Sequence, residues 1–380
     1  MARRGTNKQY GIFSFFTGAG FLDLGFESCG FVSLSANEID SHFAAVYRYS
    51  RAKMGLPPPR FGLHEESIAN FLGQPERKKW LASTLDFARS EFQAVGFVGG
   101  PPCPDFSVAG KQAGAHGRHG QLSQVYMDAI CSFRPDFFVF ENVKGLLSTA
   151  KHREFFNALV EQVQTVGYAI DWRLLNSMNY GVAQDRDRVI LFGILKEHLR
   201  DSAIGGDMLL GVEWEAHQKW HEQKLKDVPW PSRTPFVENS QLEIPKGVPK
   251  ELTVEYWFRR NNVECHPNAN DFFTPRAGLE KMRRFDEGDD SRKCYKRLHR
   301  WRYSPTAAYG NNEVHLHPYK ARRLSVAEAL AIQSLPREFE LPPDISLSAK
   351  FKTIGNGVPF LLAKGVAETV GDYLSKEIAQ

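Results

Sequence analysis

The chain has 380 residues, 42% of them hydrophobic, and a formal net charge of +4. This length allows more than one domain with its own core, and no apolar run approaches the roughly 18 residues of a membrane-spanning helix. The five cysteines are scattered and form no C-x-x-C pair. Their distribution argues against a disulfide framework and against a zinc site, and it favours a reducing, cytoplasmic location.

The first half of the chain alternates apolar β-rich runs with segments of helical periodicity. Strands are predicted at 10–16, 31–37, 94–100, 136–142, 168–175 and 187–194, and helices near 41–53, 121–133 and 151–166. Such alternation is typical of an α/β protein with a doubly wound, mostly parallel sheet. Little periodicity remains over 196–320. Order returns at 321–336, where Ser325 and Glu328 have the spacing of a capping box, and a last helix is expected after Pro359.

A glycine-containing turn follows the first predicted strand. Gly18 and Gly20 allow a tight turn and the close approach of a ligand to the start of a helix. Glu38 ends the second strand 20 positions after Gly18, where dinucleotide-binding folds place a carboxylate on ribose hydroxyls. Asp23 stands where the dehydrogenase motif has a third glycine, so the pattern favours a nucleoside cofactor other than NAD. The alternative is a tight turn and a surface acid without a ligand.

A single cysteine has an unusually stiff setting in the stretch GGPPCPDFS, residues 99–107. Two glycines let the chain leave the predicted strand, and Pro101 and Pro102 then fix the backbone before Cys103. This position lies at the carboxyl edge of the sheet, where open α/β folds bind ligands. Fixed orientation favours a nucleophile, so we interpret Cys103 as one and not as a buried apolar residue. The long glycine-rich loop that follows is typical of a functional lid.

Polar and charged residues stand at the end of one further predicted strand and along an extended segment. Glu141 closes 136–142, and Gln184, Arg186 and Arg188 share one face of the extended segment QDRDR. A carboxyl group in an apolar setting can stay protonated and donate to a ring nitrogen. Arginines can hold a carboxylate, a base edge or a phosphate. Each group alone is compatible with a strand-end salt bridge. Together they predict that a thiol, an acid and an arginine converge beside a nucleoside-cofactor site.

The segment 291–303, SRKCYKRLHRWRY, contains six Lys or Arg residues, three Tyr or Trp residues and no acid. Basic residues interleaved with aromatic ones suit phosphate contact and base stacking on nucleic acid. A solvated helix face explains the same composition equally well.

Taken together, these motifs resemble those of the DNA cytosine-5 methyltransferases. The chain is similar to that family in the F-x-G-x-G loop at 16–20, the Pro-Pro-Cys at 101–103, the Glu-Asn-Val at 141–143, the Gln-x-Arg-x-Arg at 184–188, the SPT at 304–306, the helix at 323–336 and the GNGV at 355–358. The resemblance covers 10–195 and about 300–375. It implies a Rossmann-like, doubly wound fold that uses S-adenosylmethionine. The implied domains are a catalytic part at 1–195, a smaller, irregular target recognition domain at 196–320, and a segment at 321–380 that returns to the catalytic domain.

The resemblance also implies residue roles. Cys103 would attack C6 of a cytosine flipped out of duplex DNA, Glu141 would bond N3, and Arg186 would hold the carbonyl oxygen and orient Glu141. The implied catalytic set is Cys103, Glu141, Arg186, Arg188 and Gln184. The implied S-adenosyl-L-methionine site is Phe16, Gly18, Gly20, Phe21, Leu22, Glu38, Ser67, Ile68, Pro101, Asn356 and Val358. Expected DNA-binding residues are Ser107, Arg118, Arg283, Arg284, Arg297 and Arg300, with Arg259, Arg260 and Arg276 as further candidates. No metal is expected.

The chain departs from the family pattern at several positions. Phe21 replaces the glycine usual in the cofactor loop, and Gly357 stands where alanine is common. Pro104 replaces the glutamine that usually follows the cysteine. The family's Asp-Ile pair is matched only by residues 67–68, which makes Glu66 an alternative contact for the adenine amino group.

The compact length favours the modification enzyme of a prokaryotic restriction-modification system, acting as a monomer beside an independent endonuclease. One alternative is a tRNA cytosine-5 methyltransferase of the same fold. Those relatives carry Cys-Phe-Thr where this chain has Asp271 before the FFT at 272–274. A second alternative is a non-catalytic DNA-binding relative, and the presence of both Cys103 and Glu141 argues against it.

Overall fold

A nine-stranded sheet organises the first half of the chain, with the strand order β3-β2-β1-β4-β5-β7-β6-β9-β8. The computed structural model describes residues 9–102, 120–275, 278–292, 294–309 and 313–378. The strands are β1 Tyr10–Phe15, β2 Val32–Asn37, β3 Leu63–His64, β4 Ala94–Gly99, β5 Phe137–Val143, β6 Tyr168–Asn176, β7 Asp187–Leu195, β8 Ile204–Gly205 and β9 Met208–Leu209. Strands β1 to β5 run parallel, and β7 lies antiparallel between β5 and β6. The predicted fold class is confirmed.

The strand order reverses direction between β1 and β4, which are direct neighbours. Ligands in open α/β sheets bind outside the carboxyl ends of the strands at such a switch point. The glycine loop follows β1, and the chain toward Cys103 follows β4. The topology therefore brings these two motifs to the same edge of the sheet.

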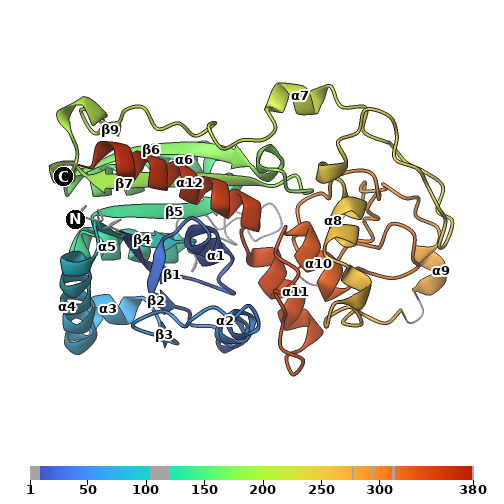
Figure 1. Cartoon of the computed structure of the whole chain (residues 1–380), viewed down its shortest axis with the longest axis horizontal. Helices are drawn as coiled ribbons and strands as arrows, with labels where there is room; N and C mark the ends of the chain where they lie inside the picture. The colour runs from blue at the N-terminus through green and yellow to red at the C-terminus, as the bar shows by residue number, and fades with distance from the viewer. Residues whose placement is uncertain (1–8, 103–119, 276–277, 293, 310–312, 379–380) are drawn as a thin grey trace, which may run out of the picture.

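Helices cover both faces of the sheet (Figure 1). They are α1 Phe21–Glu27, α2 Ser41–Lys53, α3 Ala69–Gly73, α4 Pro75–Glu91, α5 Gly120–Phe133, α6 Ala150–Thr165, α7 Glu222–Lys226, α8 Val254–Arg260, α9 Leu279–Met282, α10 Val326–Ile332, α11 Leu347–Asn356 and α12 Phe360–Glu377. Residues of α3 to α6 pack on one face, and residues of α1 and α12 pack on the other. None of the described helices combines the length and the apolar character needed to cross a bilayer.

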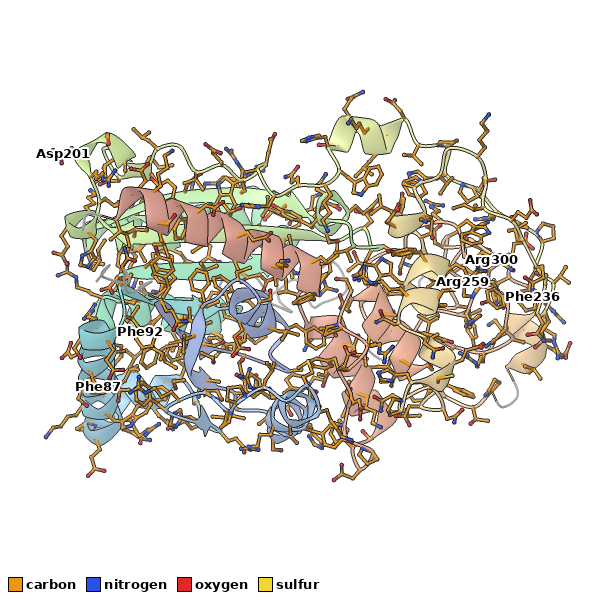
Figure 2. All side chains as sticks on the ribbon, in the orientation of Figure 1. Phe87, Phe92, Asp201, Phe236, Arg259 and Arg300 are labelled. Atoms are coloured by element: carbon orange, nitrogen blue, oxygen red, sulfur yellow. The ribbon has the colours of Figure 1, made fainter. Side chains whose placement is uncertain are left out.

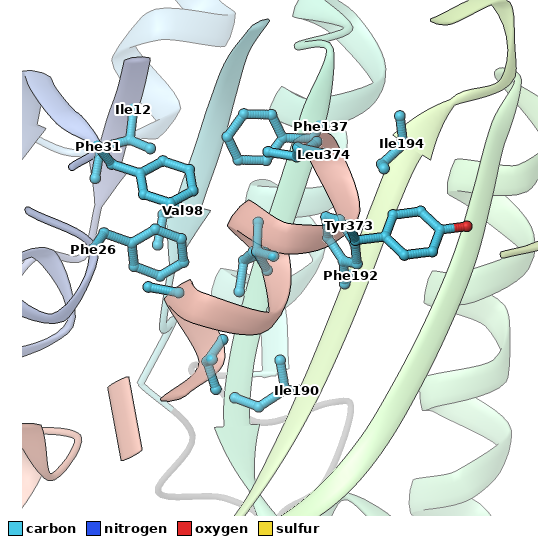
Figure 3. Packing of buried hydrophobic residues seen from close by; sticks show 14 of the residues in the cluster. Ile12, Phe26, Phe31, Val98, Phe137, Ile190, Phe192, Ile194, Tyr373 and Leu374 are labelled. Carbon is cyan, nitrogen blue, oxygen red and sulfur yellow. The ribbon is translucent and has the colours of Figure 1, made fainter. Parts of the chain in front are cut away.

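Helix α12 returns from the end of the chain to pack beside α1, as expected. Its apolar residues join the core of the first strands, where Tyr373 and Leu374 lie among Phe26, Phe137 and Phe192 (Figure 3). The two helices approach closely at Gly25, because a methyl group built there would lie 2.5 Å from Cβ of Ala363. This hydrophobic core is thus assembled from both ends of the chain.

A second lobe, on the right in Figure 1, is built from α8, α10, α11 and irregular segments. Its core includes Trp257, Phe258, Leu298 and Leu330, all at most 4% exposed. Helix α10 begins at the predicted place. Both hydrogen bonds of the Ser325–Glu328 capping box are present, since each side chain accepts the backbone N–H of the other residue. Helices α4, α8 and α11 and the short helices α3, α7 and α9 were not predicted.

Within the second lobe, a polar cluster joins the segment before α9 to helix α11 of the returning segment. Lys350 on α11 is 1% exposed, and its Nζ lies 2.7 Å from Oδ2 of Asp271. The same carboxylate oxygen accepts Nδ2 of Asn268 at 2.8 Å, and Asn268 also donates to the carbonyl of Leu341 at 3.0 Å. We call these three side chains, Asn268, Asp271 and Lys350, the clasp.

Candidate active site

A buried ion pair joins Glu141 on β5 to Arg188 on the neighbouring antiparallel strand β7. The Nε atom of Arg188 lies 2.6 Å from Oε1 of Glu141. Burial raises the pKa of Glu141, although the two guanidinium groups of Arg188 and Arg186 oppose the rise. A carboxyl group in this setting is suited to holding a proton at a pH where an exposed glutamate has lost it.

Arg186 has different partners. It is 2% exposed and donates to the carbonyl of Gly355 at 2.8 Å and to that of Ala307 at 3.2 Å. A longer bond of 3.4 Å reaches Oε1 of Gln184. Burial, together with Arg188, lowers the pKa of Arg186 well below its ordinary value. This side chain connects the start of β7 to the segment that returns from the C-terminus.

The expectation that Arg186 orients Glu141 is therefore corrected, because Arg188 makes the ion pair. Strand β7 begins at Asp187. Arg188 consequently stands on the ladder beside β5, where it pairs in register with Val143. Arg186 precedes the strand, and it donates to the main-chain carbonyls of Ala307 and Gly355.

Gln184 also acts within the protein framework. Its Oε1 accepts the backbone N–H of Ala307 at 3.0 Å, and its Nε2 donates to Oε1 of Gln333 at 3.1 Å. Gln333 in turn donates to the carbonyl of Ile354 at 2.6 Å. These bonds tie the Gln-x-Arg-x-Arg segment to α10 and α11.

The chain leading to Cys103 passes directly beside the acid. A methyl group built on Gly100 would lie only 2.6 Å from Oε2 of Glu141, so a larger residue there would displace the carboxylate. Asn142, the next residue on β5, donates its Nδ2 to the carbonyl of Pro101 at 3.4 Å and contacts Oγ of Ser123 at 3.5 Å. Pro101 is buried. The Glu-Asn pair therefore holds the acid and the root of the cysteine loop together.

Several predicted residues lie outside the described residues, namely Cys103, Pro104, Ser107, Arg118 and Arg276. Within the described ranges, no group of three or more His, Cys, Asp or Glu side chains is placed to hold a metal ion.

The glycine loop and Glu38 meet at the carboxyl ends of β1 and β2. Oε2 of Glu38 accepts the N–H of Gly18 at 2.8 Å, and Oε1 accepts that of Asp40 at 2.8 Å. Gly18 and Gly20 have φ of 56° and 81°, a region that glycine tolerates best. A methyl group on Gly18 would have no neighbour within 4 Å. The loop thus presents an open side next to a carboxylate, which a nucleoside with ribose hydroxyls fits.

Asp23 lies buried beneath this loop with 0% exposure. Its two carboxylate oxygens accept the hydroxyl of Ser14 at 2.6 Å and that of Thr17 at 2.5 Å. Thr17 directly precedes Gly18. Desolvation raises the pKa of Asp23. The residue that argues against the dehydrogenase motif therefore supports the loop from inside.

Two departures from the family pattern contact each other. A methyl group built on Gly357 would lie 2.1 Å from Cδ2 of Phe21. The Phe21 ring also packs edge-on against Phe339 at 5.2 Å between centroids. The larger side chain at 21 thus occupies the space that the smaller residue at 357 leaves open.

The remaining predicted cofactor residues have varied surroundings. Ile68 and Val358 are buried, Leu22 belongs to the core under α12, and Asn356 is exposed. Phe16 packs edge-on against Tyr126, and Oγ of Ser67 accepts the N–H of Ala69 at 3.3 Å.

Glu66, the alternative adenine contact, already has protein partners. Its carboxylate accepts Nδ2 of Asn70 at 3.0 Å and pairs with Arg77.

Two of the predicted DNA-binding arginines are buried, which corrects their expected place on the surface. Arg297 is 1% exposed and donates to the carbonyls of Phe285 and Met282 at 2.8 and 2.7 Å. Arg300, labelled in Figure 2, is 4% exposed and forms 2.8 Å bonds to both carboxylate oxygens of Glu287.

The other described candidates are exposed, namely Arg283, Arg284, Arg259 and Arg260. Arg283 forms ion pairs with Glu238 and Glu280.

A family model described as C-5 cytosine-specific DNA methylase matches residues 10–372. The chain belongs to this family. The sheet order, the acid at the end of β5 and the glycine loop after β1 are thus those of a C-5 cytosine-specific DNA methyltransferase.

Other members of the family resemble the chain along most of its length. Type II methyltransferase M.NmeDI of Neisseria meningitidis serogroup C is 54% identical over 371 residues, which cover 98% of this chain and 86% of that protein. Type II methyltransferase M.FnuDI of Fusobacterium nucleatum is 29% identical over 379 residues, covering 97% of this chain and 98% of the relative.

Solved structures share the fold of this C-5 cytosine methyltransferase. A prophage-encoded protein from Escherichia coli has a TM-score of 0.61 at 21% identity and covers 97% of this chain and 100% of its own. A Spodoptera frugiperda DNMT2 variant has a TM-score of 0.55 at 15% identity and covers 96% of this chain and 100% of its own.

The alternative of a tRNA methyltransferase is not favoured, since the matching family model is specific to DNA. The FFT segment also has a structural role here. Phe273 stacks on Phe351 at 5.5 Å between centroids, and Asp271 belongs to the clasp.

The structure adds one candidate that the sequence reasoning did not name. Ile39 follows Glu38 directly and is 67% exposed, the largest exposure among the large hydrophobic residues described. An exposed apolar side chain beside this acid suits the flat face of a nucleoside base. The available signal was an isoleucine standing between two acids just beyond the end of β2.

Proposed function

We propose that this methyltransferase acts on one cytosine within a specific duplex DNA sequence, which is flipped out of the helix and methylated at C5. Family membership supplies the reaction. The buried pair of Glu141 and Arg188, next to the close approach of Gly100, carries the assignment of the site. A base whose C5 and C6 atoms must be reached has to leave the stack.

S-adenosyl-L-methionine is the proposed cofactor, and its role is to supply the methyl group. The donor set fits such a molecule, because Glu38 provides a carboxylate for ribose hydroxyls beside the open side of Gly18. Ile39 provides apolar surface for the adenine. From the sequence motif, Asn356 and Val358 line the same pocket.

In the proposed reaction, the thiolate of Cys103 forms a bond to C6 of the flipped cytosine. Glu141 donates a hydrogen bond to N3, so that negative charge developing on the ring is stabilised. C5 becomes nucleophilic and accepts the methyl group. A water molecule then takes the proton from C5, the C5–C6 double bond re-forms, and the sulfur of Cys103 leaves with the electron pair of the C6–sulfur bond.

Arg188 is the proposed orienting group for Glu141. Its guanidinium also offers a positive charge to a carbonyl oxygen of the base. Arg186 and Gln184 are proposed to act indirectly, by holding β7 against the returning segment.

The biological role proposed is the modification half of a type II restriction-modification system. The relatives M.NmeDI and M.FnuDI bear type II methyltransferase names, and the length of the match supports the transfer of that role. We further propose that the enzyme works as a monomer in the cytoplasm and that a separate endonuclease cuts unmodified sites.

A labelled-methyl assay on mixed-sequence duplex DNA tests this proposal, with tRNA as the parallel substrate. Incorporation into duplex DNA alone is expected, and bisulfite sequencing of the product then identifies the methylated sequence. Cys103→Ala should abolish incorporation. Transfer to tRNA alone, or full activity of Cys103→Ala, would contradict the proposal.

A further inference from the structure

The second lobe contains a cavity of about 510 Å³ that no residue of the proposed reaction uses. It opens beside α8, near Arg259 in Figure 2. Its lining residues are Ile244, Lys250, Tyr256, Arg259, Arg260 and Trp301. Apolar side chains thus form its walls, and three cationic side chains stand around them.

The floor of the cavity is held rigid and has little polar character. Trp301 is 7% exposed, and its indole N–H already donates to the carbonyl of Leu242 at 2.8 Å. The ring therefore presents carbon to the cavity. Ile244, at 38% exposure, extends this apolar surface toward solvent.

The three cationic side chains differ in whether a carboxylate already pairs with them. Arg259 lies 5.5 Å from the centre of the Trp301 ring, and its Nε bonds Oε1 of Glu255 at 2.7 Å. Arg260 lies over Trp257. In the described part of the chain, no carboxylate forms an ion pair with Lys250 or Arg260, and both are exposed. Two positive charges at this rim are thus available to a ligand.

We propose that this cavity binds the sugar-phosphate backbone of the DNA substrate outside the target base. A deoxyribose has an apolar face that suits Trp301 and Ile244, and the phosphates on either side would meet Lys250 and Arg260. Backbone contacts of this kind position a duplex without reading its sequence. The inference rests on the proposed function, because it takes duplex DNA as the substrate.

The course of the chain brings the cavity near the reacting base. Trp301 is three residues from Ser304, whose backbone bridges to Gln184, and three residues of extended chain span at most about 11 Å. Gln184 leads to Arg188 and hence to Glu141. A duplex with its target base at Glu141 extends beyond that base by roughly 3.4 Å per nucleotide, so the proposal requires that one of its flanking stretches runs toward the cavity.

An acidic protein segment would satisfy the same charges. DNA is favoured, because the cavity and the catalytic edge are joined by one short segment and the enzyme's own substrate is a polyanion. If substitution of Lys250 and Arg260 weakened the binding of an acidic protein segment but left the binding of DNA unchanged, the proposal would be overturned.

The test compares two double variants that each remove two positive charges. Lys250→Ala/Arg260→Ala alters the cavity and leaves Arg259 in place, since Arg259 also pairs with Glu255. Lys78→Ala/Lys79→Ala is the control, because both lysines are exposed on α4, at the opposite end of the molecule (Figure 1). DNA affinity is measured by fluorescence anisotropy over a range of salt concentrations, for duplexes with and without the methylated sequence.

We expect the slope of log affinity against log salt to be less steep for the cavity variant by about 1.8, that is, less negative, because each phosphate contact contributes about −0.9. At about 0.1 M salt this corresponds to a loss of up to about 60-fold in affinity, equal for both duplexes. The control should match the wild type, and Lys250→Arg/Arg260→Lys should restore binding.

Equal slopes for the cavity and control variants would overturn the inference. A loss confined to the methylated sequence would do the same, since it indicates base reading. A lowered melting temperature without rescue by the conservative variant would mark a structural role and also count against the cavity. A wild-type protein that methylates no duplex would instead contradict the proposed function itself.

Discussion

The Nε atom of Arg188 lies 2.6 Å from Oε1 of Glu141, and only 9% and 10% of the two side chains are exposed. The ion pair fixes the position of the Glu141 carboxyl group, and it makes the pKa of that group depend on the charge of Arg188. Burial raises the pKa of Glu141, and Arg188 lowers it. The balance between these effects decides over which pH range the acid carries the proton that the proposed reaction uses.

Arg188→Ala should therefore move the pH dependence of methyl transfer. Loss of the guanidinium raises the pKa of Glu141 further, so the acid stays protonated to higher pH. The basic limb of the kcat profile should shift upward, while kcat itself falls about 10²- to 10³-fold through lost stabilisation of charge. Arg188→Lys should keep the limb nearer the wild-type position. A limb that stays in place or moves to lower pH would disprove the coupling.

Gly100→Ala should displace the Glu141 carboxylate, because the new methyl group would lie 2.6 Å from Oε2. A misplacement of about 1 Å can cost about 10²-fold in rate, and we expect a fall of that order in kcat. Gly73→Ala is the matched control, since a methyl group there meets nothing within 4 Å. Steady-state kinetics and a thermal melt of both variants check this, and wild-type kcat in Gly100→Ala would refute it.

Asp23→Ala should weaken binding of S-adenosylmethionine. The change leaves the buried hydroxyls of Ser14 and Thr17 without their acceptor, at a cost of roughly 1–3 kcal/mol for each unsatisfied group. The loop at Gly18 loses its support, so the cofactor Kd measured by calorimetry should rise. Asp86→Ala, an exposed change on α4, should leave it unchanged.

Asp23→Asn should alter how stability depends on pH. Because the folded pKa of Asp23 is raised, its favourable contribution is complete below the unfolded value of about 3.9. The contribution is lost as pH rises through the folded pKa. The free energy of unfolding of the wild type should therefore fall relative to Asp23→Asn across that window. Urea titrations of both proteins at several pH values test this. If the free energies of unfolding of the two proteins changed with pH by the same amount, the prediction would be contradicted.

Gly357→Ala should be unfavourable alone and tolerated with a smaller residue at position 21. The added methyl group would overlap the Phe21 ring, and overpacking of a core typically costs about 1–3 kcal/mol. Phe21→Ala/Gly357→Ala should recover part of that loss. A double-mutant cycle on unfolding free energy and cofactor Kd measures the coupling. Additive effects of the two changes would show that the positions are independent.

Much of the catalytic half could be predicted from sequence because its signals are local. The apolar runs ending in Gly99 and Asn142 predict buried parallel strands, and strand ends of this kind place residues at one edge of a sheet. Helix α4 was missed because its buried positions are only Leu81, Leu85 and Ala88, in an otherwise polar stretch. Its pattern is that of a helix largely exposed to solvent.

The hydrogen-bond and ion-pair partners of the charged residues could not be predicted from the sequence. Arg186 and Arg188 share one face of an extended segment, and only the start of β7 at Asp187 separates their roles. Arg297 and Arg300 lie in a basic run typical of a surface. Carbonyl groups and Glu287 contributed by distant segments surround them in the folded chain. Such long-range partners leave no periodicity to detect.

The clasp has a consequence for exchanging specificity between related enzymes. A graft that follows the proposed recognition segment, 196–320, would carry Asn268 and Asp271 into another methyltransferase but leave Lys350 behind, so their ion pair would depend on the host residue. A host with an apolar residue at that position would leave the partly exposed carboxylate of Asp271 without its cationic partner. Functional chimeras of this enzyme should therefore be limited to hosts that keep the lysine, whatever DNA sequence the graft reads.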